Sequence, residues 1–289
     1  MKLSDKSPTS THRVLVYGQP KCGKTELVGC LSQEFNLVWI DLEKGYGTLF
    51  KFPREWQERI DIIAIPDTKV FPIAIETCLK IVTGVEVKIC REHGKVSCML
   101  CTKSGAPMDV VHLNKLGPRD IVVYDSLTQL SNSAMNFLTK NQEDLYKPEW
   151  SDYRNQGQLL DKFLSQIQQA QYNVCCITHE VESELEDGKK KIVPVCGTSN
   201  FSKNTAKYFD HVVYCEVKNR KHTFASATTF ANNILTGSRG DVAVEKDEVP
   251  TLLRIFKGEM EHSAQNQSAT PARAAVSNLK TLVGQGGQK

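Results

Sequence analysis

The segment that decides the fold of this chain is Gly18-Gln19-Pro20-Lys21-Cys22-Gly23-Lys24-Thr25. It matches the pattern G-x-x-x-x-G-K-[ST], in which backbone N–H groups of a glycine-rich loop surround nucleotide phosphates. The apolar stretch Val14–Tyr17 precedes the loop and a predicted helix, Glu26–Glu34, follows it, as the motif requires. In this motif the amine of Lys24 reaches the β- and γ-phosphates and the hydroxyl of Thr25 ligates Mg²⁺. The segment therefore predicts a site for a nucleoside triphosphate and Mg²⁺.

Four further apolar runs predict strands that are covered on both faces. They are Leu37–Ile40, Ile60–Ile65, Ile121–Tyr124 and Val174–Ile177. Amphipathic stretches between them predict helices over Pro72–Val82, Ser126–Phe137 and Gln156–Gln171. Strands that alternate with helices are typical of α/β proteins, so we expect a mostly parallel sheet with helices on both faces.

After Ile177 the pattern changes from buried strands and helices to hairpins. Glu182–Val195 contains Asp187-Gly188 between two alternating stretches, which predicts a tight turn between antiparallel strands. Asp210–Val217 and Thr223–Leu235 predict two longer strands joined by a polar turn. The parallel sheet is therefore expected to carry an antiparallel extension.

The composition limits the class of protein. Hydrophobic residues make up 40% and charged residues 24% of the 289 residues, as in soluble globular proteins. The apolar runs are far shorter than the roughly 20 residues of a membrane helix, and Met1–Arg13 lacks the apolar stretch of a signal peptide. We therefore expect a cytoplasmic protein without a membrane segment. It should form one domain over residues 13–257, with an insertion at residues 85–117 and flexible ends at residues 1–12 and 258–289.

Three polar residues follow predicted strands, and the ends of parallel strands share one edge of a sheet. Asp125 is expected to hold Mg²⁺, and its other interpretation is the N-cap of the next helix. Glu43 can orient a water beside the γ-phosphate, and its other interpretation is a solvated loop acid. His179 can contact the γ-phosphate, and its other interpretation is a hydrogen-bonded histidine at a strand end.

These motifs resemble the RecA-like ATPases. The Asp-x-Glu pattern after the second strand, the Val-Val-x-Asp-Ser strand and the polar residue after the next strand are similar in order and spacing, over about residues 13–257. The resemblance implies a RecA-like P-loop core that hydrolyses ATP, with Glu43 as the catalytic carboxylate and His179 as the γ-phosphate sensor. Trp150–Tyr153 ahead of a long helix, together with the tripeptide around His179, is similar to phage RecA-like proteins of single-strand annealing and recombination.

The same resemblance implies partners. RecA-like enzymes complete their site with a basic residue of the neighbouring subunit, which follows the second strand of a late hairpin. Arg239 has that position here, so we expect a homo-oligomer with ATP between its subunits. The resemblance also implies that single-stranded DNA is a partner, with replication or recombination proteins as further candidates, in the cytoplasm of a host cell if the chain is phage-encoded.

Four soft metal ligands lie within twelve residues: Cys90, His93, Cys98 and Cys101. The two-residue spacing within each pair lets both side chains of a turn reach one ion, and the set suits a tetrahedral, structural Zn²⁺. His112 could take the place of His93, and the other interpretation is a loop without metal. Residues 85–117 contain too few apolar side chains for a core of their own, so we expect the metal to stabilise them.

Basic side chains gather after the predicted sensor strand, where RecA-like proteins place loops that face DNA. They are Lys189, Lys190, Lys191, Lys203 and Lys207. Such charges can neutralise the phosphates of single-stranded DNA with little sequence preference, and their other interpretation is a solvated hairpin. The insertion carries more basic residues, which could contact DNA or a partner or simply form a solvated face.

Two other classes of function are compatible with a phosphate loop. One is a nucleotide or small-molecule kinase, which usually carries an arginine-rich lid that does not stand out in this sequence. The other is a non-hydrolysing binding module, in which the insertion and the tail recruit a partner. Glu43 and His179 suit the activation of water, and therefore hydrolysis, better than they suit a kinase.

Overall fold

The computed structural model describes residues 11–143, 145–184, 188, 190–219, 221–225, 233–238 and 252–257. Within these ranges the main sheet has nine strands. Six are parallel and follow one another in the order β9 (His211–Lys218), β1 (Arg13–Gly18), β7 (Asn173–Glu184), β6 (Asp120–Asp125), β2 (Asn36–Asp41) and β3 (Ile60–Ala64). The antiparallel strands are β10 (Lys221–Ala225) and β11 (Gly237–Ser238) beside β9, and β8 (Lys190–Pro194) beside β7. The predicted mixed architecture is confirmed.

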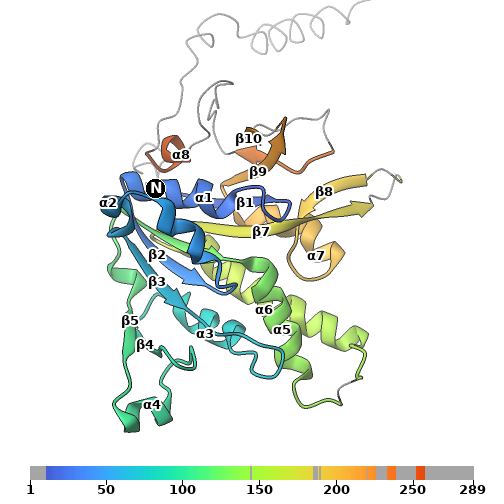
Figure 1. Cartoon of the computed structure of the whole chain (residues 1–289). Helices are drawn as coiled ribbons and strands as arrows, with labels where there is room; N and C mark the ends of the chain where they lie inside the picture. Colours follow the sequence, from blue (N-terminus) through green and yellow to red (C-terminus); the bar gives the residue numbers. More distant parts are fainter. Residues whose placement is uncertain are drawn as a thin grey trace, which may run out of the picture.

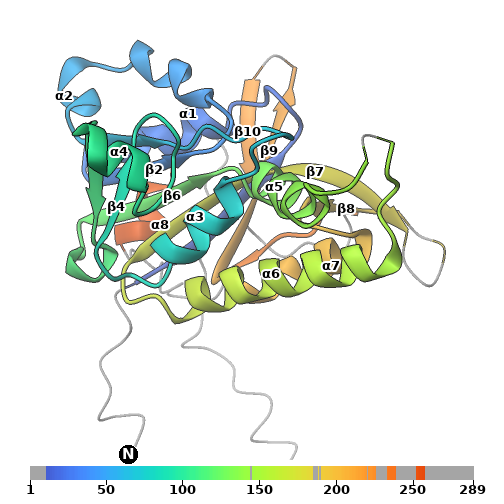
Figure 2. The same cartoon turned by 90° about the horizontal axis from the view of Figure 1, so that it is seen from below.

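Helices cover both faces of the sheet, because strand residues alternate between two buried sides (Figure 1). Val14 and Val16 of β1 face one apolar cluster, and Leu15 and Tyr17 face the other. The first side is covered by α1 (Lys24–Gly29), α2 (Arg54–Gln57), α8 (Leu253–Lys257) and two 3₁₀ turns, Cys30–Gln33 and Gly45–Lys51. The second side is covered by α3 (Ala74–Ile81), α5 (Leu127–Thr139) and α6 (Trp150–Gln169), which lie side by side in Figure 2.

The five predicted strands are all present, but β3 lies at the edge of the sheet and is only partly buried. The other difference is the length of β7. This strand continues past the sheet to Glu184 and pairs there with β8, which confirms the predicted hairpin over Glu182–Val195. The helix expected to begin at Gln156 begins instead at Trp150, because Glu149 and Asp152 form a capping box at its start. Trp150–Tyr153 is therefore the first turn of α6 and does not precede it.

The late hairpin differs from its prediction in two respects. Lys218, Lys221 and His222, which were predicted to form the turn, belong to its two strands. β9 pairs with β10 as expected, but β9 is also a parallel neighbour of β1 and so belongs to the central sheet. The described part of the second strand ends at Ala225, and residues 226–232 of the predicted strand lie outside the described residues. Ile234 returns to the sheet as an isolated parallel bridge with Ile192.

The insertion projects from one end of the sheet (Figure 1). It consists of a hairpin, β4 (Val87–Cys90) with β5 (Met108–Val111), and the short helix α4 (Met99–Ser104). Its base packs into the main core through four buried side chains: Ile89, Val96, Val111 and Leu113. The buried hydroxyl of Thr77 on α3 donates a 2.7 Å hydrogen bond to the carbonyl of Gly94 and holds the insertion against the domain.

The predicted flexible ends lie almost entirely outside the described residues, as does Arg239. His12 is an exception, because its N–H donates to Asn173 Oδ1 at 2.9 Å and its carbonyl accepts from Val174 N at 2.9 Å. The folded domain therefore begins before Arg13. None of the helices in the described ranges is long and apolar enough to cross a membrane.

Candidate functional site

The predicted phosphate loop joins β1 to α1, and two of its glycines are required by geometry. A Cβ atom at Gly18 would lie 2.0 Å from the carbonyl oxygen of Cys215 on β9, so only glycine fits there. Gly23 has φ of 94°, a backbone conformation that side chains disfavour. The loop therefore wraps tightly around the position that a phosphate group occupies in this motif.

Lys24 is the buried cation of the loop. Its Nζ donates to the carbonyl oxygens of Gly18 and Gln19 at 3.0 Å and 2.7 Å, and 7% of the residue is exposed. The side chain is thus folded over the loop, beside the cavity that the loop borders. A buried ammonium at this point can neutralise phosphate charge strongly, because water screens it poorly.

A polar cleft of about 460 Å³ lies next to the loop. The residues around it that carry chemistry are Lys24, Thr25, Glu43, Asp125, His179 and His222. The parallel sheet brings several of these residues together. Asp41 is paired in register with Asp125, and Gly18 is paired in register with His179. The carboxyl ends of β1, β2, β6 and β7 therefore meet at one edge, the usual place for a ligand in such sheets.

Asp125 and Thr25 form the part of the cleft that suits Mg²⁺. The Thr25 hydroxyl donates to Asp125 Oδ2 at 3.2 Å. Burial, with smaller contributions from the charges of Glu43 and Asp41, raises the pKa of Asp125 to about 7. A hydroxyl and a carboxylate held this close are hard oxygen ligands of the kind Mg²⁺ prefers. The other interpretation of Asp125 is wrong, because the N-cap of α5 is Ser126, which accepts a bond from Gln129 N.

Glu43 lies in the same cleft and is oriented by two neighbours. The Ser126 hydroxyl donates a hydrogen bond to Glu43 Oε1. Asp41 Oδ1 accepts from the backbone N–H groups of Glu43 at 3.3 Å and Gly45 at 3.1 Å, which shapes the turn that carries Glu43. Burial raises the pKa of Asp41 despite these bonds. This role of Asp41 was not predicted from the sequence, although its position two residues before Glu43 at a strand end was a signal.

His179 lines the cleft next to Gly18, the first residue of the loop, at the point where β7 leaves the central sheet. Its backbone N–H donates to Thr128 Oγ1 at 3.0 Å, which ties the strand to α5. Burial, and then the charge of Lys24, lowers the pKa of His179. A neutral imidazole at this position can still donate one hydrogen bond to a bound oxygen.

The sequence comparisons agree with this geometry. Residues 10–240 match the family described as AAA domain. The chain belongs to this family. No curated protein matches the sequence. The AAA domain is a P-loop NTPase family, so the chain contains an AAA-type ATP-binding domain, and the cleft borders the phosphate loop of that domain.

The insertion of this AAA domain brings the four predicted zinc ligands together. Their ligand atoms all lie within 4.8 Å of one another, in a small buried cluster of the described part of the chain. His93 Nδ1 is 3.1 Å from Cys101 Sγ and 3.8 Å from each of the other two sulfurs. Such spacing fits one tetrahedral Zn²⁺ with no open position. His112 does not belong to the set, because its Nδ1 faces Glu86 Oε2 at 3.7 Å.

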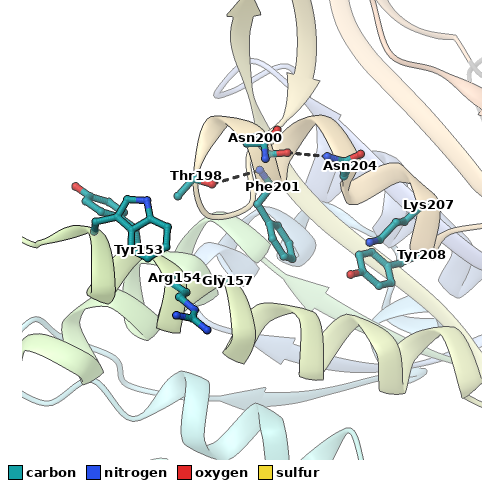
Figure 3. A pocket seen from close by; sticks show the side chains of 10 residues that line it. Tyr153, Arg154, Gly157, Thr198, Asn200, Phe201, Asn204, Lys207 and Tyr208 are labelled. Carbon is teal, nitrogen blue, oxygen red and sulfur yellow. Dashed lines mark hydrogen bonds between the residues drawn. The ribbon is translucent and has the colours of Figure 1, made fainter.

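A second hollow of the AAA domain, about 700 Å³, lies between the start of α6 and the short helix α7 (Ser199–Asn204) (Figure 3). We call it the α6–α7 groove, and its lining residues include Trp150, Tyr153, Arg154, Phe201, Lys207 and Tyr208. Trp150 is 77% and Tyr153 44% exposed, whereas aromatic side chains are usually more buried. Phe201 points toward α6, and its ring lies next to Gly157. The groove thus combines aromatic faces with two cations.

The basic residues predicted to contact DNA have different surroundings. Lys190 forms an ion pair with Glu182 at 2.7 Å, and Lys203 donates to the carbonyl of Glu184. Lys207 lies 4.7 Å above the ring of Tyr208, at the edge of the α6–α7 groove. Lys189 lies outside the described residues. The structure therefore places one of these lysines, Lys207, in the lining of the α6–α7 groove.

Proposed function

We propose that this AAA domain is a RecA-like ATPase that hydrolyses ATP and acts on single-stranded DNA. The observation that carries the ATPase part is the convergence of Lys24, Asp125 and Glu43 in one cleft, although they come from three separate segments of the chain. A binding module needs the phosphate loop alone. The Glu43 carboxylate, which a hydrogen bond from the Ser126 hydroxyl holds at the cleft, suits the activation of water.

Each residue of the cleft has a separate task in this proposal. Thr25 and Asp125 hold Mg²⁺, which neutralises charge on the phosphates when it is bound. Lys24 binds the β- and γ-phosphates, and Glu43 orients the attacking water and accepts its proton. The Ser126 hydroxyl keeps the Glu43 carboxylate in place. His179 senses the γ-phosphate from the end of the central part of β7.

The α6–α7 groove supports the DNA part of the proposal. Aromatic side chains stack on unpaired bases without regard to sequence, and Arg154 and Lys207 can neutralise the phosphates that flank them. Arg154 lies 6.0 Å from the ring of Trp150, so a cation and a stacking surface are adjacent. Such a surface suits single strands, because the bases of a duplex are not available for stacking on a protein.

A continuous path joins this groove to the ATP cleft. β7 runs from His179 at the cleft to Glu184, and β8 leads back to α7. Ser183 and Ser199 bring the hairpin and α7 together, with 2.8 Å between their hydroxyl oxygens. A movement of His179 with the state of the nucleotide would therefore be passed to the groove, and we propose that ATP turnover and DNA binding are coupled.

We further propose that the protein acts as a homo-oligomer in phage annealing, recombination or replication. In this proposal Arg239 reaches the ATP of the neighbouring subunit and assists hydrolysis only after assembly. The support is the resemblance to RecA-like enzymes and the position of the late β9–β10 hairpin beside β1. Mixing Arg239→Ala protein with Lys24→Ala protein tests it, because a mixed interface can pair one intact loop with one intact arginine.

ATP turnover with and without an oligothymidine strand tests the proposal as a whole. We expect DNA to stimulate the wild type, and we expect Lys24→Ala to be inactive in both conditions. The double variant Trp150→Ala/Arg154→Ala should keep its basal rate and lose the stimulation. Lys162→Ala is the matched control, since Lys162 is an exposed cation of α6 that does not line the groove.

The outcomes separate the parts of the proposal. If the wild type hydrolysed ATP but DNA did not raise the rate, the proposed ATPase activity would stand and the proposed role with DNA would be refuted. Stimulation that survives in the double variant would move the DNA site away from the groove. Phosphoryl transfer to an added small-molecule acceptor would replace the ATPase by a kinase.

A further inference from the structure

The carbonyl group of Cys22, in the middle of the phosphate loop, is bound by two strands far away in the sequence. His222 Nδ1, from β10, lies 2.7 Å from this oxygen, and Cys215 Sγ, from β9, lies 3.3 Å from it. A carbonyl oxygen has no hydrogen, so Nδ1 of His222 must carry the proton and donate it. Both donors belong to the same hairpin, in which Phe224 is the register partner of Cys215.

These two bonds determine the orientation of the Cys22–Gly23 peptide group. In a trans peptide the C=O and the following N–H point in opposite directions. Because the Cys22 carbonyl is held toward β9 and β10, the N–H of Gly23 is turned away from them. Donation of backbone N–H groups to phosphate oxygens is the means by which such a loop binds a nucleotide.

The ring of His222 also occupies the space beside Gly23. A Cβ atom added at Gly23 would lie 2.7 Å from His222 Nδ1 and 3.1 Å from its Cε1. Gly23 has a positive φ of 94°. Glycine can adopt this backbone conformation, but it can adopt several others about as readily. A contact from outside the loop can therefore select this conformation among those that glycine allows.

We propose that His222 is a positioning residue of the phosphate loop. It holds the Cys22–Gly23 peptide in the orientation that binds the nucleotide phosphates, and it thereby links nucleotide affinity to the β9–β10 hairpin. This inference goes beyond the proposed DNA role and depends only on the ATP-binding cleft. His222 acts through the loop, so its effect should be on affinity more than on any step of hydrolysis.

Three substitutions distinguish this role from a direct contact with phosphate. His222→Ala removes both ring nitrogens. His222→Asn keeps a donor at the position of Nδ1, and His222→Gln places a donor near the position of Nε2. The dissociation constants of ATP and ADP are measured by titration calorimetry. Thr223→Ala, one residue along the same strand, is the matched control, and thermal unfolding checks that each variant folds.

We expect His222→Ala to weaken the binding of both nucleotides about three- to tenfold, the range for one lost hydrogen bond. His222→Asn should restore wild-type affinity, whereas His222→Gln and His222→Ala should be alike. Wild-type affinity in His222→Ala would overturn the proposal. Restoration by His222→Gln and not by His222→Asn would also overturn it, because the outer nitrogen would then contact the phosphates directly.

Discussion

The ATP cleft and the zinc cluster are both built from a few polar side chains, but they are assembled in opposite ways. The cleft joins residues that are far apart in the chain, and the contact between Cys22 and His222 spans 200 positions. The four zinc ligands lie within residues 90–101. The cleft is held by strand ends that are fixed in the main core. Among the described residues, Ala106 and Met108 are the only apolar side chains that pack against the buried cysteines.

The two regions are therefore stabilised by different interactions. The apolar core holds the carboxyl ends of β1, β2, β6 and β7 in place, so the cleft does not need its ligand in order to form. The tip of the insertion has almost no apolar core, so we expect a metal to supply most of its stability. Changes at one region should therefore leave the other nearly intact, and the predictions below test this independence.

Loss of zinc should have the largest effect, since binding of structural Zn²⁺ contributes on the order of 10 kcal/mol in small zinc-dependent folds. Purified wild type should contain about one zinc per chain. The double variant Cys98→Ser/Cys101→Ser should contain none, and trypsin should cut it within residues 85–117. Its ATP affinity should stay within about twofold of wild type.

Cys30→Ser is the control for this experiment, because Cys30 is a free thiol outside the cluster. It should keep its zinc and resist trypsin. Wild-type protein that contains no zinc after preparation in reducing buffer without chelator would refute the metal site. Loss of ATP binding in the double variant would refute the independence of the two regions.

Glu43→Gln should affect only the cleft. Gln cannot accept the proton of the attacking water, so we expect turnover to fall about 10²- to 10⁴-fold while ATP still binds. Rates at saturating ATP and the dissociation constant of ATP are the two measurements. Glu58→Gln, at an exposed acid after α2, should leave both unchanged. A variant that lost affinity and kept its maximal rate would identify Glu43 as a structural acid.

Asp125→Asn should weaken Mg²⁺-dependent ATP binding and stabilise the empty domain. The pKa of Asp125 is raised to about 7, above that of an unfolded chain, so the folded wild type binds an extra proton between about pH 4 and pH 7. Its stability through this group therefore falls as the pH rises through that window. Asn does not titrate, so the variant keeps its free energy of unfolding as the pH rises. Its gain in this free energy over the wild type, of the order of a few kcal/mol, should be complete above pH 7.

Thermal unfolding at pH 5 and pH 8, without nucleotide and Mg²⁺, measures this effect. The difference in unfolding temperature between Asp125→Asn and wild type should be larger at pH 8. Asp61→Asn, at an exposed position of β3, should show no such trend. An equal difference at both pH values would mean that Asp125 is already ionised at pH 5.

Thr77→Val should have the smallest effect, because it removes a single buried hydrogen bond between α3 and the insertion. We expect the unfolding free energy to fall by about 1–2 kcal/mol, with zinc content and ATP affinity unchanged. Thr83→Val removes an exposed bond of the same kind, from Thr83 Oγ1 to the carbonyl of Lys80, and should cost less than about 0.5 kcal/mol. Equal losses in the two variants would show that the contact with Gly94 does not dock the insertion.

Much of the fold could be predicted because its signals are local. The phosphate loop is a contiguous motif, and the buried strands are continuous apolar runs whose bounds differ little from the structure, apart from the extended β7. Asp125 and Glu43 could be predicted because each follows such a run. The start of α6 was predicted too late in the sequence, because its first turn is largely exposed and depends on a capping box at Glu149.

Other features depend on which strands become neighbours, and sequence patterns do not encode this directly. Nothing near His222 indicates that it contacts Cys22, since the contact exists only because β9 lies beside β1 and β10 beside β9. The α6–α7 groove likewise requires two helices from different parts of the chain to meet. The choice of His93 over His112 depends on the turn at Gly94, which brings His93 back onto the three sulfurs.

The sequence by itself determined the phosphate loop, the parallel core and the three cysteines of the predicted zinc site, because spacing within a short segment limits what its side chains can reach. Only the tertiary structure decided the strand order, the orientation of Glu43 by Ser126 and Asp41, the bonds to the Cys22 carbonyl and the aromatic groove. These features arise from the burial of both faces of one sheet, and burial is a property of the whole chain. A local pattern can favour a strand, but the packing of all the strands selects its neighbours.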